Sequence, residues 1–138
     1  MVVVDASFLM AVFIEETHTD FARGNYSDLE DEDMAAPALV MWEFANILWK
    51  KRRRGEITDE NILEADDYLA SLTLKVPAPI TTYDVATLST AALRHQLTAY
   101  DASYLLLALE TSAALATIDK NLTRAAVAAG VTVHSPFA

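Results

Sequence analysis

The sequence predicts an α/β fold in which helices alternate with the strands of a parallel sheet. Three observations lead to this prediction. Residues 2–4 are consecutive valines, and a β-branched run without polar alternation is typical of a strand covered on both faces. Short apolar runs then alternate with segments of helical periodicity, which implies parallel pairing and right-handed crossovers. Finally, 138 residues with 53% apolar content can bury one core, so we expect residues 1–138 to form a single domain.

The first strand, residues 2–4, ends at a carboxylate, Asp5. Helical periodicity follows over about residues 6–16. Asp5 is therefore expected at the carboxyl edge of the sheet, where open α/β folds bind their ligands. A second helix is expected over about residues 19–29, and it runs into an acidic segment, residues 28–33, that is simplest as a solvated loop.

The next strand and helix are expected on either side of Pro37. Residues 34–36 form a short apolar run that we interpret as the second strand. Pro37 suits the first turn of a helix, because its missing N–H is not needed there. The helix, about residues 38–54, ends in cations followed by Gly55, which favours a helix C-terminus. Its buried face should consist of Val40, Phe44, Ile47 and Leu48.

The second half of the chain continues the alternation. Thr58 and Asp59 open a helix, expected to about residue 74, that pairs antiparallel with the preceding helix across a short turn. Pro77 and Pro79 mark a break and disfavour a central strand there. The elements expected beyond them are helices over about 82–95 and 97–109, a strand over 113–118, a helix over 119–129 ended by Gly130, and a strand over 131–133.

Composition excludes several classes of protein. The absence of cysteine removes disulfides and thiolate chemistry, and it suits a reducing cytoplasm, where we expect the protein to act. Asp5 interrupts the first apolar run and no basic segment precedes it, so we expect no signal peptide. No apolar stretch approaches the roughly 18 residues that a membrane helix needs, so we expect no membrane partner.

Charge is distributed unevenly. The formal net charge is −10, which repels polyanions at long range and argues against general electrostatic binding of nucleic acid. Five of the ten basic residues are nevertheless consecutive, at residues 50–54. This basic cluster is either a solvated helix end or a local site for phosphates.

Four acids are the candidate catalytic residues, and each has an ordinary structural explanation. Asp5 and Asp119 stand between a strand and a helix, where Asp is a preferred N-cap. Asp101, three residues after Thr98, fits a capping-box-like pattern and favours the helix dipole. Glu43 lies in an apolar helical stretch with no basic residue three or four positions away, so it should reach solvent or meet a cation.

Their joint arrangement favours a metal site. Asp5 and Asp119 end strands, and parallel strands end along one edge of a sheet. A carboxylate cluster there repels itself and raises its own pKa values unless a cation neutralises it. Oxygen ligands without cysteine or convergent histidine select Mg²⁺ or Mn²⁺ over zinc. We therefore predict that Asp5, Glu43, Asp101 and Asp119 are catalytic and metal-ligating in phosphodiester hydrolysis.

Four further residues are candidates for supporting roles. Ser7 and Thr117 are placed to hydrogen-bond a ligand carboxylate or a phosphate. Asn46, one helical turn from Glu43, could orient that carboxylate, and Lys50 could contact phosphate. The aromatic residues near these positions are interpreted as core or subunit contacts: Trp42, Trp49 and Tyr104.

Four segments of the chain, each containing one of the four acids, carry a resemblance to a known family. They are Val3-Val4-Asp5-Ala6-Ser7 at the start, and residues 37–48, 97–104 and 115–122. In this order and at these spacings, over nearly its whole length, the chain resembles the PIN domain, and within it the VapC-type toxins of type II toxin-antitoxin modules. Trp42, directly before the acid of the second segment, is bulkier than the family pattern leads us to expect.

The resemblance implies more than the residues alone do. It implies a PIN-like α/β fold of three layers, in which helices flank a central parallel sheet of four to five strands. It also implies that Asp5, Glu43, Asp101 and Asp119 form an acidic quartet. It implies Mg²⁺- or Mn²⁺-dependent endoribonuclease cleavage of RNA, often tRNA or ribosomal RNA, that blocks translation. It also implies a homodimer neutralised by a cognate VapB-type antitoxin, with DNA contacted only through that antitoxin.

Two other classes of function remain open from the sequence. A receiver-like signalling module also gathers Asp residues around Mg²⁺, but it needs paired acids after the first strand, and here Ala6 and Ser7 follow Asp5. Ser7 likewise occupies the second Asp position of an Asp-x-Asp phosphatase, and three glycines are too few for a dinucleotide-binding fingerprint. A catalytically silent protein-interaction domain, whose acids only cap helices, is the remaining alternative.

Overall fold

The computed structural model describes residues 1–78 and 80–138. Its centre is one four-stranded sheet in which every neighbouring pair of strands is parallel, in the order β2-β1-β3-β4. Val3 on the central strand lies opposite Ala35 on one side and Leu115 on the other. The predicted central parallel sheet is thereby confirmed. The strands are β1 (Val2–Val4), β2 (Met34–Ala35), β3 (Ala114–Ala116) and β4 (Val133–His134).

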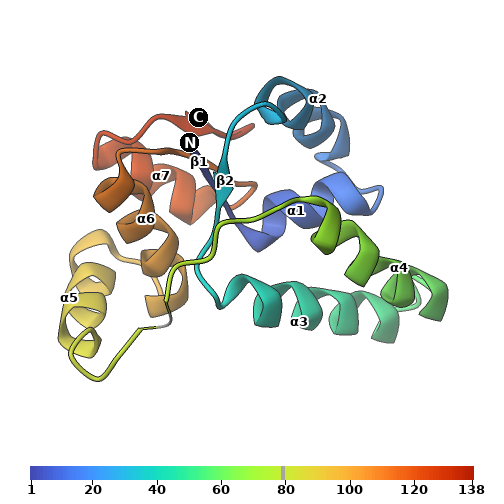
Figure 1. Ribbon diagram of the computed structural model, residues 1–138, viewed down its shortest axis with the longest axis horizontal. Helices are drawn as coiled ribbons and strands as arrows, with labels where there is room; N and C mark the ends of the chain where they lie inside the picture. Colours follow the sequence, from blue (N-terminus) through green and yellow to red (C-terminus); the bar gives the residue numbers. More distant parts are fainter. Residues whose placement is uncertain (79) are drawn as a thin grey trace.

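Helices cover both sides of the sheet (Figure 1). In that view α1 to α4 lie to the right of the strands, and α5, α6 and α7 lie to the left. Within the part of the chain that the structure describes, none of the helices is both long enough and apolar enough for a membrane crossing. The helices are α1 (Ala6–Phe13), α2 (Thr19–Leu29), α3 (Val40–Arg53), α4 (Asp59–Ser71), α5 (Val85–His95), α6 (Ala99–Thr111) and α7 (Lys120–Ala128).

Three helix boundaries differ from the sequence prediction by three residues: the start of α5, the end of α4, and the end of α1, which stops at Phe13 instead of about residue 16. The side chain of Thr19, fully buried, donates a hydrogen bond of 2.7 Å to the carbonyl of Ala11. This contact satisfies a carbonyl that a longer helix would have used, and Ile14 takes an extended conformation. A buried hydroxyl from the next helix thus ends α1 early.

One isolated parallel bridge pairs Ala35 of β2 with Lys75. This bridge is the only trace of a fifth strand within residues 1–78 and 80–138. It lies just before the proline break that the sequence predicts, and Pro79 in that break lies outside the described residues. The last strand begins at Val133, two residues later than expected.

The core forms where the sheet meets the helices on either side. All three residues of β1 are fully buried, and burying each large apolar side chain contributes about 1.5–3 kcal/mol. On one side, α1, α3 and α4 meet through a ring cluster in which Phe13 lies 4.8 Å from Tyr68 and 5.9 Å from Phe44, centroid to centroid. This cluster fixes α3, and hence Glu43, relative to the end of β1.

The tryptophans were expected in the core or in a subunit contact, and the structure excludes the first of these. Trp42 is 74% exposed and Trp49 is 51% exposed, because both lie on the outer face of α3, away from Phe44 and Leu48. A subunit contact stays a prediction for these two residues, and the core interpretation was wrong for them. It was right for Tyr104, which is 1% exposed.

Candidate active site

Asp5 occupies the first position after the central strand and is 5% exposed. Its Oδ1 accepts hydrogen bonds from the Ser7 hydroxyl at 2.7 Å and from the backbone N–H of Phe8 at 2.9 Å. Its Oδ2 accepts a short hydrogen bond from the Thr117 hydroxyl. The bond from Phe8 is the N-cap of α1, so the capping role foreseen for Asp5 is real. The capping bond uses only Oδ1, and the Asp5 carboxylate also accepts hydrogen bonds from two side chains, Ser7 and Thr117.

Ser7 and Thr117 join the ends of β1 and β3 through this carboxylate. The Ser7 hydroxyl, which donates to Asp5, accepts the backbone N–H of Ile118 at 3.0 Å. The Thr117 hydroxyl accepts the backbone N–H of Asp119 at 3.0 Å. Both hydroxyls therefore lie where the sequence places them, next to an acid of the quartet, and each one also ties down the loop that carries Asp119.

Asp119 and Asp101 begin the two helices that face this edge. The Oδ1 atom of Asp119 caps α7 by accepting the N–H of Leu122 at 2.7 Å. Asp101 lies in the first turn of α6, and its backbone N–H donates to the Thr98 hydroxyl at 3.1 Å. Both carboxylates are half-buried. The charge of Asp119 acts on Asp101, and the cap of α7 uses one oxygen of the Asp119 carboxylate.

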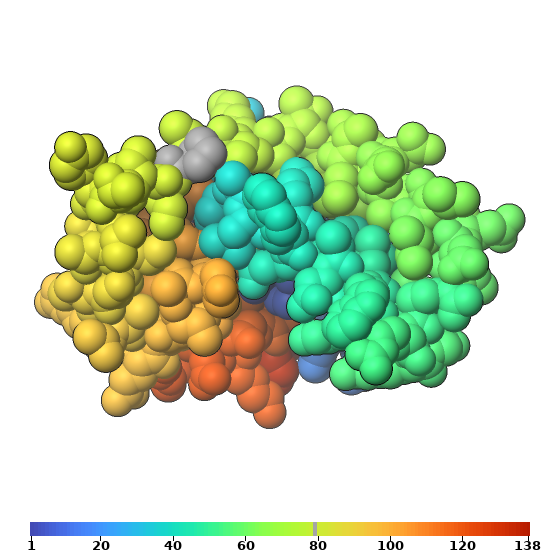
Figure 2. All heavy atoms as spheres, turned by 90° about the horizontal axis from the view of Figure 1, so that it is seen from below, coloured from blue at the N-terminus to red at the C-terminus, as the bar shows by residue number. Residues whose placement is uncertain are grey.

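Glu43 comes from the opposite side of this hollow, in the first turn of α3. Its Oε1 accepts a hydrogen bond from the hydroxyl of Tyr104 on α6. Figure 2 looks onto this face of the molecule: the teal start of α3, the orange start of α6 and the red-orange segment around residue 119 surround a hollow with blue N-terminal atoms at its base. The structure thus brings together acids that are far apart in the chain.

The electrostatics of the hollow disfavour ionised acids. Burial raises the pKa of Asp5 from 3.8 to about 7, against the lowering effect of its three hydrogen bonds. Burial also raises the pKa of Glu43, where the charges of Asp101 and Asp119 add to the effect, and the pKa of Asp101, where the charge of Asp119 adds to it. In the described part of the chain, no ion pair links any of the four acids to a basic side chain.

The donor atoms fit a hard divalent cation, while the present side-chain positions do not yet enclose one. In residues 1–78 and 80–138, no group of three or more acids and histidines lies close enough together to hold a metal ion. The candidate ligands are nevertheless carboxylate oxygens, and the described residues include no thiolates. A bound cation would counteract the raised pKa values of Asp5, Glu43 and Asp101.

Asn46 does not take the role considered for it. Its side chain is exposed, and in the structure as described it makes no hydrogen bond to Glu43. The partner of Glu43 is Tyr104, which sequence analysis assigned only to the core or a subunit contact. One signal could have identified it: Tyr104 lies three residues after Asp101, so both residues face the same side of α6.

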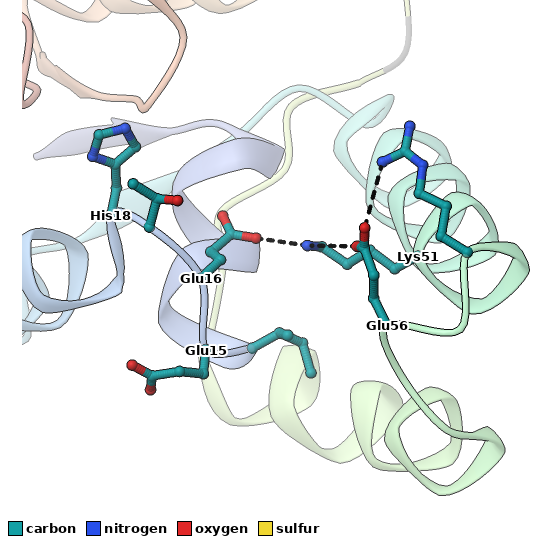
Figure 3. A pocket seen from close by; sticks show the side chains of 8 residues that line it. Glu15, Glu16, His18, Lys51 and Glu56 are labelled. Carbon is teal, nitrogen blue, oxygen red and sulfur yellow. Dashed lines mark ion pairs between the residues drawn. The ribbon is translucent and has the colours of Figure 1, made fainter.

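The basic cluster at residues 50–54 is largely occupied by ion pairs. Figure 3 shows Lys51 pointing between two acids: its Nζ lies 2.8 Å from Glu16 and 3.7 Å from Glu56. Arg52 pairs with an acid of α4 at 2.7 Å, and the Arg53 guanidinium lies over the Trp49 ring. Most of the cluster therefore resembles a solvated helix end.

Lys50 is the exception. It is exposed, it forms no ion pair with any residue that the structure describes, and it lines a hollow of about 200 Å³ together with Ser7. Lys51 and Arg54 line the same hollow, so Lys50 differs from them only in having no acidic partner among the described residues.

The sequence pattern of the PIN domain family matches residues 2–128. The chain belongs to the PIN domain family. A curated relative, Ribonuclease VapC3 of Pyrobaculum aerophilum, is 33% identical over 125 residues, which cover 87% of this chain and 90% of the relative. This match places the chain with the VapC-type PIN domains and confirms the resemblance seen in the sequence.

Solved structures agree on the fold. A crystal structure of a Pyrobaculum aerophilum protein superposes with a TM-score of 0.69 at 24% identity, covering 96% of this chain and 88% of that one. The structure of Mycobacterium tuberculosis VapC20, a toxin that cleaves the sarcin-ricin loop, gives a TM-score of 0.70 at 17% identity, covering 96% of this chain and 97% of that one. The PIN-like α/β architecture is therefore shared.

Proposed function

We propose that this PIN domain is a Mg²⁺- or Mn²⁺-dependent endoribonuclease. The observation that carries the proposal is Asp5: a buried carboxylate with a pKa raised to about 7, to which the charge of Asp119 contributes, and with no basic partner in the described structure. Keeping such a cluster costs stability, and perturbed acids in a hollow are typical of functional sites. The relative named as a ribonuclease supports the reaction class.

The four acids would hold the cation, with Asp5 fixed in place by Ser7 and Thr117. The bound cation would supply positive charge to orient a phosphate and offset charge on the leaving oxygen. Glu43, which accepts a hydrogen bond from the Tyr104 hydroxyl, would contribute its carboxylate to the ligands of the cation. Lys50, beside Ser7, would contact a neighbouring RNA phosphate.

The biological part of the proposal is a toxin that inhibits translation by cutting tRNA or ribosomal RNA in the cytoplasm. In this proposal a cognate VapB-type antitoxin neutralises the toxin, and the toxin contacts DNA only through that antitoxin. The toxin acts as a homodimer. The names of the relatives, a ribonuclease and a toxin that cleaves the sarcin-ricin loop, support this reading. We further propose that residues 1–138 act as one domain, since they share one sheet and one buried cluster.

Asp5→Asn tests the proposal. It keeps the shape of the side chain and removes the charge, so cleavage of RNA in Mg²⁺ should fall by at least about 100-fold while the fold persists. Asp67→Asn, which changes an exposed acid on α4, is the matched control and should cleave like the wild type. Cleavage by a demonstrably pure Asp5→Asn protein at the wild-type rate would end the assignment. Toxicity on expression, and rescue by a small adjacent gene product, test the toxin part separately.

One alternative retains a specific observation in its favour. Asp5 and Asp119 do cap α1 and α7, as a catalytically silent interaction domain would require. Capping explains one oxygen of each carboxylate, but it does not explain Glu43, which caps no helix and lies half-buried among like charges. A protein that binds no Mn²⁺ and cleaves no RNA would favour this alternative. Membership of the PIN family argues against the receiver-like module.

A further inference from the structure

We propose that Tyr104 is a positioning residue of this site, which holds the Glu43 carboxylate at the acidic hollow through its hydroxyl group. The inference rests on the proposed function, because it assigns Tyr104 a purpose only if Glu43 serves metal binding and catalysis.

The contact joins two elements that meet at the site. Tyr104 is on α6 and Glu43 is on α3, 61 residues apart in sequence, and the hydroxyl of Tyr104 donates to Oε1 of Glu43. The tyrosine ring is 1% exposed, so its position is fixed by the core. Asp101 lies one helical turn earlier on the same side of α6. A rigid aromatic side chain therefore sets the distance between Glu43 and the acids of α6 and α7.

Glu43 has no other means of being held. A glutamate side chain loses roughly 1.5–2 kcal/mol of conformational freedom when it is fixed. Three or four residues away along α3, where helix partners lie, there are only Leu39, Val40, Asn46 and Ile47. Within the described residues, the Tyr104 hydroxyl is the only hydrogen-bond donor to the Glu43 carboxylate. Loss of this donor should let Glu43 turn toward solvent, away from its fellow acids.

Tyr68 shows what a tyrosine with a purely structural role looks like here. It is also largely buried, in the ring cluster of α1, α3 and α4, and its hydroxyl donates to the backbone carbonyl of Leu9 at 3.1 Å. Any carbonyl could satisfy a core tyrosine in this way. The acceptor of Tyr104 is instead a carboxylate of the candidate site, and the two phenol groups form a matched pair for experiment.

The experiment compares Tyr104→Phe with Tyr68→Phe, each of which removes one hydroxyl and keeps the ring. Mn²⁺ binding to the full chain, measured by calorimetry without RNA, should weaken about 10-fold for Tyr104→Phe and less than twofold for Tyr68→Phe. In an RNA cleavage assay at saturating Mn²⁺, Tyr104→Phe should lower kcat and leave KM for RNA unchanged. In a Glu43→Gln background, Tyr104→Phe should change Mn²⁺ affinity less than twofold, because its target is already altered.

The outcomes separate this inference from the proposed function. Equal Mn²⁺ affinities for Tyr104→Phe and the wild type would overturn the positioning role and make Tyr104 a core residue only. If the wild type neither binds Mn²⁺ nor cleaves RNA, the proposed function fails. The ¹³C resonance of the Glu43 carboxyl then decides the positioning role by itself: a shift in Tyr104→Phe that is absent in Tyr68→Phe supports it, and no shift overturns it.

Discussion

The pH dependence of stability is the most direct consequence of a buried Asp5. The pKa of this carboxyl is about 7 in the folded protein against an ordinary value of 3.8. Between these values the folded protein keeps a proton that the unfolded chain has lost. The free energy of unfolding therefore falls as the pH rises toward 7 and levels off above it. Asp5→Asn removes the ionisable group and should abolish this part of the dependence.

The size of the effect follows from the width of the interval. One pH unit corresponds to about 1.36 kcal/mol. Between pH 5 and pH 8, ionisation of Asp5 should therefore cost the wild type about 2.7 kcal/mol of unfolding free energy relative to Asp5→Asn. Glu43 and Asp101 also have raised pKa values, but they are present in both proteins and largely cancel in the difference.

Urea unfolding of the two proteins without divalent metal, at half-unit steps from pH 5 to pH 8, measures this difference. Asp67→Asn again serves as the control, because an exposed carboxylate should give a difference that does not change with pH. A difference between wild type and Asp5→Asn that stays constant within about 0.5 kcal/mol would refute the reasoning. Asp5 would then be solvated, and its burial would impose no cost.

Three further predictions test the surroundings of the site. Thr117→Val removes a donor to the buried Asp5 carboxylate and should destabilise the fold by about 1–3 kcal/mol, more at pH 8 than at pH 5, in the same urea assay. Lys50→Ala should reduce the slope of log RNA affinity against log salt concentration by about 0.7. Arg52→Ala, which removes a residue already in an ion pair, should change this slope less. Equal slopes for the wild type and both variants would exclude a phosphate contact of Lys50. Phe44→Ala empties the centre of the ring cluster and should cost about 3–5 kcal/mol, and a loss below 1 kcal/mol would show that the cluster does not fix α3.

The sequence predicts most of this architecture because its local signals agree with the fold. The valines of β1 have no polar face to expose, and Thr98 and Asp119 cap helices where their sequence positions indicate. The early end of α1 could not be predicted. It depends on a hydroxyl from Thr19 that reaches back to Ala11, a tertiary contact with no periodic signature.

In the candidate site, too, some features could be predicted from the sequence and others could not. Strand ends can be located from sequence, and this places Asp5 and Asp119 at one edge. The partner of Glu43 could not be identified, because the choice between Asn46 and Tyr104 depends on how α6 packs against α3. The sequence left Trp42 and Trp49 open between the core and a subunit contact for a related reason: an apolar residue on an amphipathic helix does not reveal by itself which face is buried.

The link between Asp5 and Thr117 has a consequence for the order of events during synthesis. The two residues are 112 positions apart, so at about 5–20 residues per second the ribosome needs on the order of 10 s to supply the second after the first. Until then β1 lacks its neighbouring strand β3, and Asp5 lacks the hydrogen bond from Thr117. If the protein cleaves RNA as proposed, a nascent chain that has not yet supplied Thr117 would lack a donor that holds Asp5, and it should be inactive.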